Sequence, residues 1–358
     1  MAPILQSTPT LRHPMSARTQ LKFLARLWDR FWNHGPTATL YFHSPCFDGI
    51  VSAVLAWDFA EAVLKWKVGD LQPVNYQRRT SWLSQPLHQP CAVVDFLYHP
   101  QATFWADHHS TAFLTAEAED DFEHRRSPYL IYDDAADACA KLLWDRLGRD
   151  FGYQNPRYAE LVSWATKTDA ARYSSVGEAI EGTAPALRIN GSLVYGEENG
   201  YSAWLVRQLR RRPLEAVANL RKVRLRYERF RLDAARGLKL FRERARLDRG
   251  VVVFDVDADD AIVPRYAPYY FFPDASYSAG VVRRRDSATI TAMRNPWREF
   301  ASMHLGKIFE PLGGGGHERV GSVVLRGVDT ARAEMVLDQL LNVLREVRSR
   351  RVSGSHSR

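Results

Sequence analysis

Short β-rich runs alternate with helical patterns along the first half of the chain. The run TATLYF (37–42) precedes a stretch with helical periodicity, DGIVSAVLAWDFAEAVLKW (48–66). Three further β-rich runs follow, the last of which leads into a second helical pattern: CAVVDF (91–96), ATFWADHH (102–109), PYLIYDD (128–134) and then AADACAKLLWDRLG (135–148). Strands that alternate with helices are typical of a parallel, doubly wound sheet, so this half is predicted to be an α/β domain.

The second half opens with a long and strongly basic amphipathic pattern. Residues 207–249 contain sixteen Arg or Lys against five Asp or Glu, interleaved with apolar positions. This pattern predicts a long connecting helix, interrupted near Gly237. Two strands and then two helices are expected after it: 250–256, 287–295, 297–309 and 330–350. We expect these elements to form a smaller α/β domain.

At roughly 100–200 residues per domain, a chain of 358 residues predicts two domains. The expected order is an N-terminal extension with one amphipathic helix, a first α/β domain, a basic helical connector, a smaller C-terminal domain and a disordered tail: 1–36, 37–200, 201–249, 250–347 and 348–358.

Composition narrows the class of protein. Hydrophobic residues make up 46% of the chain and charged residues 25%, which excludes wholesale disorder. No run approaches the roughly 18–20 uncharged apolar residues of a membrane span, and the N-terminus has no apolar signal-peptide core, so we expect a cytoplasmic protein without a membrane partner. The net charge of +8 suggests an anionic partner. The oligomeric state stays open, a homodimer included.

Acidic and imidazole side chains gather where the predicted strands end. Doubly wound sheets bind their ligands at the carboxyl ends of the strands, which here carry His43, Asp95 and Asp107. The same edge is expected to collect further reactive residues: Cys46, Asp48, His108, His109 and Asp169. One or two divalent cations would turn the repulsion within such a cluster into attraction. Mixed oxygen and nitrogen ligands favour Mn²⁺, with Mg²⁺, Co²⁺ and Fe²⁺ as alternatives.

Five motifs stand in a fixed order along the chain. They are HSPCFDG (43–49), VVDF (93–96), ADHH (106–109), TKTDAARY (166–173) and GGGGHERVG (313–321), with AMRN (292–295) before the last. Alone, HSPCFDG would be an ordinary strand-to-helix loop, and the glycine run a flexible linker. Together, the motifs make residues 37 to 327 resemble a DHH-family phosphoesterase with the DHH-associated C-terminal domain.

The resemblance implies a di-metal site. His43 and Asp95 would hold one ion, and Asp95 would bridge to the second. The second ion would have these ligands: Asp48, Asp95, His108 and Asp169. Two neighbouring ions lower the pKa of a shared water and neutralise a phosphate, as hydrolysis of a phosphate ester requires.

The resemblance also assigns the residues around the ions. The catalytic set would be Asp95, Asp107, His108 and His109, in which Asp107 orients the neighbouring imidazoles and His109 faces the substrate phosphate. Residues 37–200 would form the catalytic domain, and 250–347 would bind the remote end of the substrate. The substrate-binding residues would be Arg294, Gly313, Gly314, Gly315, Gly316 and His317. Within this set, the backbone N–H groups of the glycines can approach an anion closely.

Cys46 departs from the pattern, because many family members have an acid there. A thiolate ligand would shift the metal preference toward Zn²⁺ or Fe²⁺. Two interpretations stay open, a weakened first site that works with a single ion and a thiolate-assisted one.

Three substrate classes fit the resemblance: short oligonucleotides, nucleotide bisphosphates and cyclic dinucleotides. A nucleotide or short oligonucleotide is favoured by the basic helix and by nearby aromatic residues, which are features of strand binding. The alternatives are a polyphosphate or pyrophosphate hydrolase, and a protein that binds nucleotides or nucleic acid without turnover.

Overall fold

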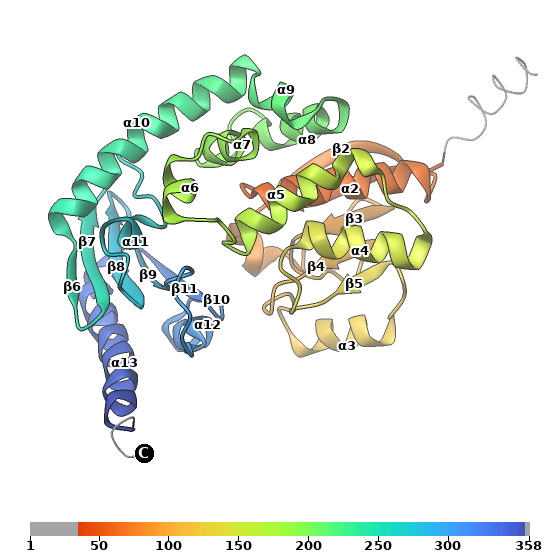
Figure 1. Cartoon of the computed structure of the whole chain (residues 1–358). Helices are drawn as coiled ribbons and strands as arrows, with labels where there is room; N and C mark the ends of the chain where they lie inside the picture. The colour runs from red at the N-terminus through yellow and green to blue at the C-terminus, as the bar shows by residue number, and fades with distance from the viewer. Residues whose placement is uncertain (1–34, 355–358) are drawn as a thin grey trace, which may run out of the picture.

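The computed structural model describes residues 35–354, with two sheets separated along the chain (Figure 1). Only residues 35 and 36 of the predicted N-terminal extension are described, so its predicted amphipathic helix lies outside that range. Residues 355–358 of the predicted tail lie outside it as well. Within residues 35–354, no helix combines the length and the apolar character that crossing a membrane requires.

The first sheet is fully parallel, with the strand order β2-β1-β3-β4-β5. Its strands are β1 (Thr37–His43), β2 (Lys67–Val74), β3 (Cys91–Val94), β4 (Phe104–Asp107) and β5 (Leu130–Tyr132). The helices between and after them are α2 (Phe47–Ala62), α3 (Ala116–His124), α4 (Cys139–Phe151), α5 (Ala159–Asp169), α6 (Val176–Glu181) and α7 (Pro185–Leu193). The predicted parallel, doubly wound sheet is thus confirmed.

Side chains alternate between two cores on the faces of this sheet, as the period of two in a strand requires. Leu40 and Phe42 of β1 point into the core shared with α2, α4 and α5. Tyr41, between them, points into the opposite core, where Trp82 and Phe122 also lie. Both faces are therefore covered, and ligands can approach the sheet only at its edges.

The basic segment forms three helices: α8 (Tyr201–Arg211), α9 (Leu214–Ala218) and α10 (Arg221–Arg244). The predicted interruption near Gly237 is wrong, because the chain breaks instead before Pro213 and at Asn219. Helix α10 continues through Gly237, where a Cβ would lie 1.9 Å from the carbonyl oxygen of Ile262. The glycine permits close packing of α10 against another segment, and it does not end the helix.

Several cations of α10 hold this helix against the first domain. Arg226 donates to Glu198 at 2.8 Å and to the carbonyl oxygen of Ser192 at 2.8 Å. Arg229 lies over the ring of Tyr195 at 4.1 Å. Part of the basic charge in the connector therefore has a structural role.

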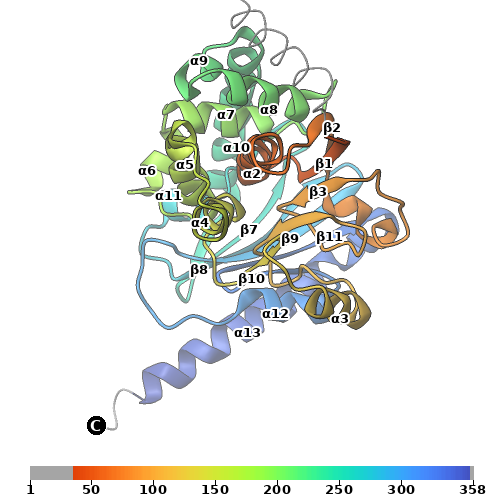
Figure 2. The same cartoon turned by 90° about the vertical axis from the view of Figure 1, so that its right-hand side faces the viewer.

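The second sheet is mixed, with the order β10-β11-β9-β8-β7-β6, in which only the β7–β8 pair is parallel. Its strands are β6 (Arg246–Asp248), β7 (Val251–Asp257), β8 (Tyr277–Arg284), β9 (Ser287–Arg294), β10 (Gly315–His317) and β11 (Val320–Arg326). Three helices accompany them: α11 (Ala267–Phe271), α12 (Leu305–Phe309) and α13 (Ala333–Gly354). The smaller C-terminal α/β domain, joined through a long helix, is confirmed. The first half of α13 packs on β8 and β9, and its C-terminal end extends beyond the sheet (Figure 2).

The helix predicted over 297–309 is wrong in extent, because only Leu305–Phe309 are helical. Trp297 instead packs toward the first domain, and its indole N–H donates to the carbonyl oxygen of Tyr173 at 3.1 Å. The short helix begins where Nδ1 of His304 accepts from the backbone N–H of Lys307 at 3.2 Å.

Candidate functional site

The carboxyl ends of three adjacent strands bring the first site residues together. His43 is the last residue of β1, Asp95 follows β3 directly, and Asp107 is the last residue of β4. Because β3 pairs with both β1 and β4, the three side chains emerge at one edge of the sheet.

Asp95 lies at the centre of this edge. Its carboxylate is 1% exposed, with Oδ2 3.3 Å from Nδ1 of His43 and Oδ1 3.7 Å from Nε2 of His108. Its backbone φ of +55° is in the left-handed region, which is uncommon for a residue other than glycine. Gly49 permits this packing, because a Cβ there would lie 2.2 Å from the carbonyl oxygen of His43 and 3.0 Å from Oδ2 of Asp95.

Asp48 joins the site to the start of α4. Its carboxylate accepts from the backbone N–H groups of Cys139 at 2.7 Å and of Ala140 at 3.0 Å. Negative charge is favourable at a helix N-terminus, so this contact positions both the helix and the carboxylate.

His108 faces Asp48 and Asp169. Its Nδ1 lies 3.0 Å from the carbonyl oxygen of Ala136, which assigns the proton to Nδ1 and leaves Nε2 as the nitrogen that could ligate a metal ion. Nε2 lies 3.4 Å from Oδ2 of Asp169 and 3.9 Å from Oδ2 of Asp48. A fixed outer nitrogen of this kind is the usual support of a metal-binding histidine.

His109 is held by Asp107. Oδ1 of Asp107 lies 2.7 Å from Nδ1 of His109 and accepts from the backbone N–H of His108 at 2.8 Å. Burial alone would lower the pKa of His109, but the carboxylates of Asp107, Asp95 and Asp169 outweigh it and raise the pKa to about 10. The imidazole is therefore a cation at neutral pH in the ion-free site.

Three groups of side chains have ligand atoms close enough for a cation, within 4.8 Å of one another: His43 with Cys46 and Asp95, Asp95 with His108 and His109, and Asp48 with His108 and Asp169. Burial and the neighbouring carboxylates raise the pKa of Asp48 well above its ordinary value, and burial is also the main cause of the raised pKa of Asp169. A divalent cation would stabilise the charged forms of both carboxylates and so lower both pKa values. The fold thus brings together all eight residues expected at this edge, seven of them in these groups and Asp107 through its contact with His109.

Three buried polar atoms at this edge also indicate that the cluster suits a divalent cation. Oδ1 of Asp95, Oδ2 of Asp107 and the hydroxyl of Tyr76 are buried and make no hydrogen bond to any other described residue. Burying such polar atoms destabilises a folded protein unless they bind another group, such as a hydrogen-bond partner or an ion. The donor set suits divalent cations, with Cys46 adding a soft ligand next to oxygen and nitrogen. In the ion-free site, burial and the charges of Asp95, Asp169 and Asp48 raise the pKa of the Cys46 thiol.

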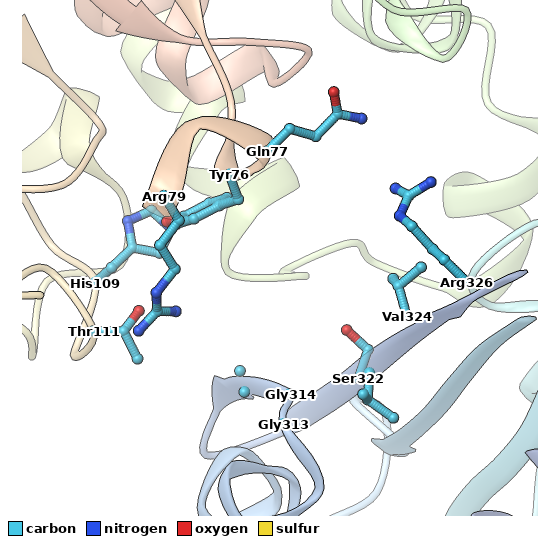
Figure 3. Close-up of a pocket in the computed structure, with 13 residues that line it drawn as sticks. Tyr76, Gln77, Arg79, His109, Thr111, Gly313, Gly314, Ser322, Val324 and Arg326 are labelled. Carbon is cyan, nitrogen blue, oxygen red and sulfur yellow. The ribbon is translucent and has the colours of Figure 1, made fainter. Parts of the chain in front are cut away.

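A cavity of about 820 Å³, the glycine cavity, separates this edge from the C-terminal domain (Figure 3). The first domain contributes Tyr76, Gln77, Arg79, His109 and Thr111, and the second contributes Gly313–Gly316, Ser322, Val323, Val324 and Arg326. At Gly316 the φ of +150° and a Cβ position 2.2 Å from the carbonyl oxygen of Val320 require glycine. The predicted glycine loop thus faces His109 across the cavity, whereas the side chain of His317 lies outside what the structure describes.

A second cavity of about 350 Å³, the arginine cavity, adjoins the other side of the cluster. His108 and Asp169 line it from the first domain, and Arg265, Arg294 and Arg319 line it from the second. Arg294 and the glycine loop, predicted as one binding set, therefore belong to two cavities.

The sequence reasoning missed Tyr76, Arg79, Arg265 and Arg319. Tyr76 and Arg79 belong to a 3₁₀ turn (Tyr76–Ser81) just after β2, at the same sheet edge as the predicted residues. Recognition of β2 as a strand would have indicated them. The two arginines of the second domain carry no motif that could have done so.

Comparison with solved structures identifies the fold. The chain is similar to the pGpG-specific phosphodiesterase PggH from Vibrio cholerae, with 18% identity, a TM-score of 0.61, and 86% of this chain and 99% of that chain covered. It is also similar to a DHH domain of a member of the S1p family of ribosomal proteins, with 15% identity, a TM-score of 0.50, and coverage of 93% and 92%. RecJ in complex with Mn²⁺ from Thermus thermophilus aligns with 15% identity, a TM-score of 0.51, and coverage of 89% of this chain and 54% of that chain.

A scan against protein-family models and a search of curated proteins found no match to the sequence. The structural likenesses show that the chain has the fold of the DHH-family proteins, and the predicted resemblance is confirmed at that level.

Proposed function

We propose that the protein is a divalent-metal-dependent phosphoesterase. The observation that carries this proposal is the buried cluster of carboxylates and imidazoles at the edge of the first sheet, with the glycine loop facing it across a cavity. Bound there, two divalent ions would neutralise the phosphate and lower the pKa of a water.

Two of the three groups of neighbouring atoms supply the proposed ligand sets. His43, Cys46 and Asp95 would hold one ion, and Asp48, His108 and Asp169 the other. Asp95 would serve the second ion as well, since its Oδ1 lies 3.7 Å from Nε2 of His108. Mn²⁺ is the favoured ion because the donors are mixed oxygen and nitrogen. A thiolate contribution from Cys46 would favour Zn²⁺ or Fe²⁺ instead.

The remaining residues of the cluster would act on the phosphate. His109 lines the glycine cavity, and the adjacent carboxylate of Asp107 favours its protonated form, so it can donate a charge-assisted hydrogen bond to a phosphoryl oxygen. Asp107 fixes the ring of His109 in this orientation. The glycine loop lies opposite, where its backbone N–H groups can bind the far end of the same substrate.

A phosphodiester between nucleotides is the substrate that fits best. Cavities lie on both sides of the cluster, so both ester groups on the phosphorus can be accommodated. The larger cavity falls within the roughly 300–1,000 Å³ of small-molecule sites and includes the ring of Tyr76 opposite the glycines. An aromatic wall favours a nucleotide over inorganic polyphosphate. The neighbour PggH is named as a pGpG-specific phosphodiesterase, which is consistent with this class.

A Mn²⁺-supplemented panel of substrates tests this proposal. It would contain a 5′-phosphorylated dinucleotide, a longer oligonucleotide, a nucleotide bisphosphate, a cyclic dinucleotide and polyphosphate. We expect release of mononucleotide from the short linear substrate, abolished by EDTA. Release of phosphate from polyphosphate alone would contradict the nucleotide assignment, and binding of all nucleotides without turnover would contradict the enzymatic one.

A further inference from the structure

A third cavity, the connector cavity, lies between the first domain and the connecting helix α10. It shares no lining residue with the glycine cavity or the arginine cavity. Helices α6 and α7, with the loop between them, form one wall, and α10 forms the other (Figure 1). The volume of about 470 Å³ falls within the roughly 300–1,000 Å³ of small-molecule sites.

The wall on α10 is one face of that helix and carries two aromatic rings. Its lining positions follow the three- and four-residue spacing of a helix face: Tyr227, Phe230, Arg231, Ala234, Ala235 and Leu238. The rings of Tyr227 and Phe230 lie 6.1 Å apart, centre to centre, and are tilted by 31°. Gly191 of α7 packs against both, because a Cβ there would lie 2.7 Å from Cδ1 of Phe230 and 3.1 Å from Cδ2 of Tyr227. The aromatic wall is therefore held by the packing of the two helices.

Three polar side chains line this cavity without a partner. The amide of Asn190 is half-buried, and the hydroxyl of Thr183 and the guanidinium of Arg231 are exposed. Within residues 35–354, none of these three groups forms a hydrogen bond or an ion pair. The carboxylate of Glu181, by contrast, accepts from the hydroxyl of Tyr270. Aromatic rings beside an unpaired amide suit a ligand that has flat apolar faces and a polar edge.

The cavity also reaches the loop between His43 and Cys46, two of the proposed metal ligands. Pro45 of this loop is exposed and lines the cavity. The neighbouring Ser44 is buried, and its hydroxyl lies 2.6 Å from that of Ser202 in α8. A ligand in the connector cavity would therefore contact this loop without entering either cavity of the candidate site.

We propose that the connector cavity binds a purine nucleoside, with the base against the rings of Tyr227 and Phe230 and its polar edge on the amide of Asn190. An asparagine amide offers a donor and an acceptor side by side, which can pair with the donor and acceptor of a purine edge. Stacking on aromatic rings adds to the affinity for any base. Thr183 and Arg231, on the exposed side, would meet the ribose hydroxyls. This site goes beyond the proposed function, because it requires neither metal ions nor hydrolysis.

The test is isothermal titration calorimetry of the full chain with adenosine in EDTA. Adenosine has no phosphate and EDTA removes metal ions, so the main contacts proposed for the candidate site are not available to it. We expect a dissociation constant below about 1 mM for adenosine and no binding of ribose. Asn190→Leu should weaken the binding roughly tenfold or more. Ala235→Trp, which extends a large ring into the cavity from an exposed position of α10, should abolish it.

The matched control is Lys239→Trp, at an exposed position of α10 that does not line the cavity, and it should keep the binding. Tyr76→Ala should keep it too, because Tyr76 belongs to the glycine cavity. Circular dichroism checks that each variant is folded. No binding by the wild-type protein, unchanged binding in Asn190→Leu or Ala235→Trp, or loss of binding in Tyr76→Ala would overturn the connector-cavity site.

Discussion

Nδ1 of His109 lies 2.7 Å from Oδ1 of Asp107, and this contact favours a positive charge on the imidazole that lines the glycine cavity. Three carboxylates, with Asp107 first, raise the pKa of His109 to about 10 against the effect of burial. The pair thus converts a neutral imidazole into a fixed cation at the edge of the sheet.

Asp107→Asn should lower the pKa of His109 in the ion-free protein. Burial then acts with less opposition, because the nearest carboxylate has lost its charge. The measurement is an NMR titration of the His109 imidazole in EDTA, with Asp145→Asn, at an exposed ion pair on α4, as the control. An unchanged pKa in Asp107→Asn would contradict the role of this carboxylate.

The same shift predicts how stability depends on pH. The pKa of His109 is raised from 6.5 to about 10 on folding, so the stabilisation from its protonated form is complete below pH 6.5 and is lost as the pH rises through about 10. In EDTA, the difference in the free energy of unfolding between the wild-type protein and His109→Gln should shrink across this window. A difference that grows with pH would have the opposite sign and would exclude the assignment.

Cys46 should act as a metal ligand. Its sulfur lies within 4.8 Å of ligand atoms of His43 and Asp95, which is close enough for one ion to contact all three. The Co²⁺-loaded protein should therefore show a near-ultraviolet thiolate-to-cobalt charge-transfer band. Cys46→Ser should remove this band, and Cys139→Ser, which alters a buried thiol outside the three ligand groups, should retain it. No such band in the wild-type protein would favour a weakened first site.

Asp48 should contribute more to stability than Asp169, although both are proposed ligands. Asp48→Ala leaves two backbone N–H groups at the start of α4 without their acceptor, whereas Asp169 is 29% exposed and its carboxylate contacts Nε2 of His108 at 3.4 Å. In EDTA, urea unfolding should show a loss that is larger by about 1–2 kcal/mol for Asp48→Ala than for Asp169→Ala. Equal losses would indicate that the contacts to α4 are unimportant.

Gly237→Ala should destabilise the protein, although alanine is the better helix former. The new Cβ would meet the backbone carbonyl of Ile262 at 1.9 Å, and relief of this clash should cost about 1–3 kcal/mol. Gly148→Ala in α4 is the control, because only the side chain of Gln154 stands in the way and can move. Thermal unfolding should rank Gly148→Ala above Gly237→Ala, and the reverse order would contradict the packing of α10.

The strands with continuous apolar runs could be predicted from the sequence, but β2 could not. Its residues, KVGDLQPV, include a glycine, an aspartate and a proline, and it forms the edge of the sheet with mostly exposed or half-buried side chains. An edge strand needs no continuous apolar run, so the hydrophobic pattern gives little signal. Because β2 was missed, Tyr76 and its place in the glycine cavity were missed too.

The functional site likewise contains some residues that the sequence predicts and others that it does not. His43, Asp95 and Asp107 were predicted because the ends of parallel strands meet at one edge of a sheet, whatever the conformation of the loops. The separation of Arg294 from the glycine loop, and the presence of Arg265 and Arg319, depend on how two domains distant in sequence pack together. No local pattern encodes that packing, so it required the structure.

The central claim is that Asp95 joins two ions that hydrolyse a nucleotide phosphodiester. The most direct measurement is release of mononucleotide from a 5′-phosphorylated dinucleotide in Mn²⁺, compared between the wild-type protein and Asp95→Asn, with bound metal quantified in both. We predict Mn²⁺-dependent release by the wild-type protein, and less than about a tenth of that rate, with reduced metal content, in the variant. A variant that keeps more than about a tenth of the rate, or a wild-type protein that releases nothing, would contradict the account.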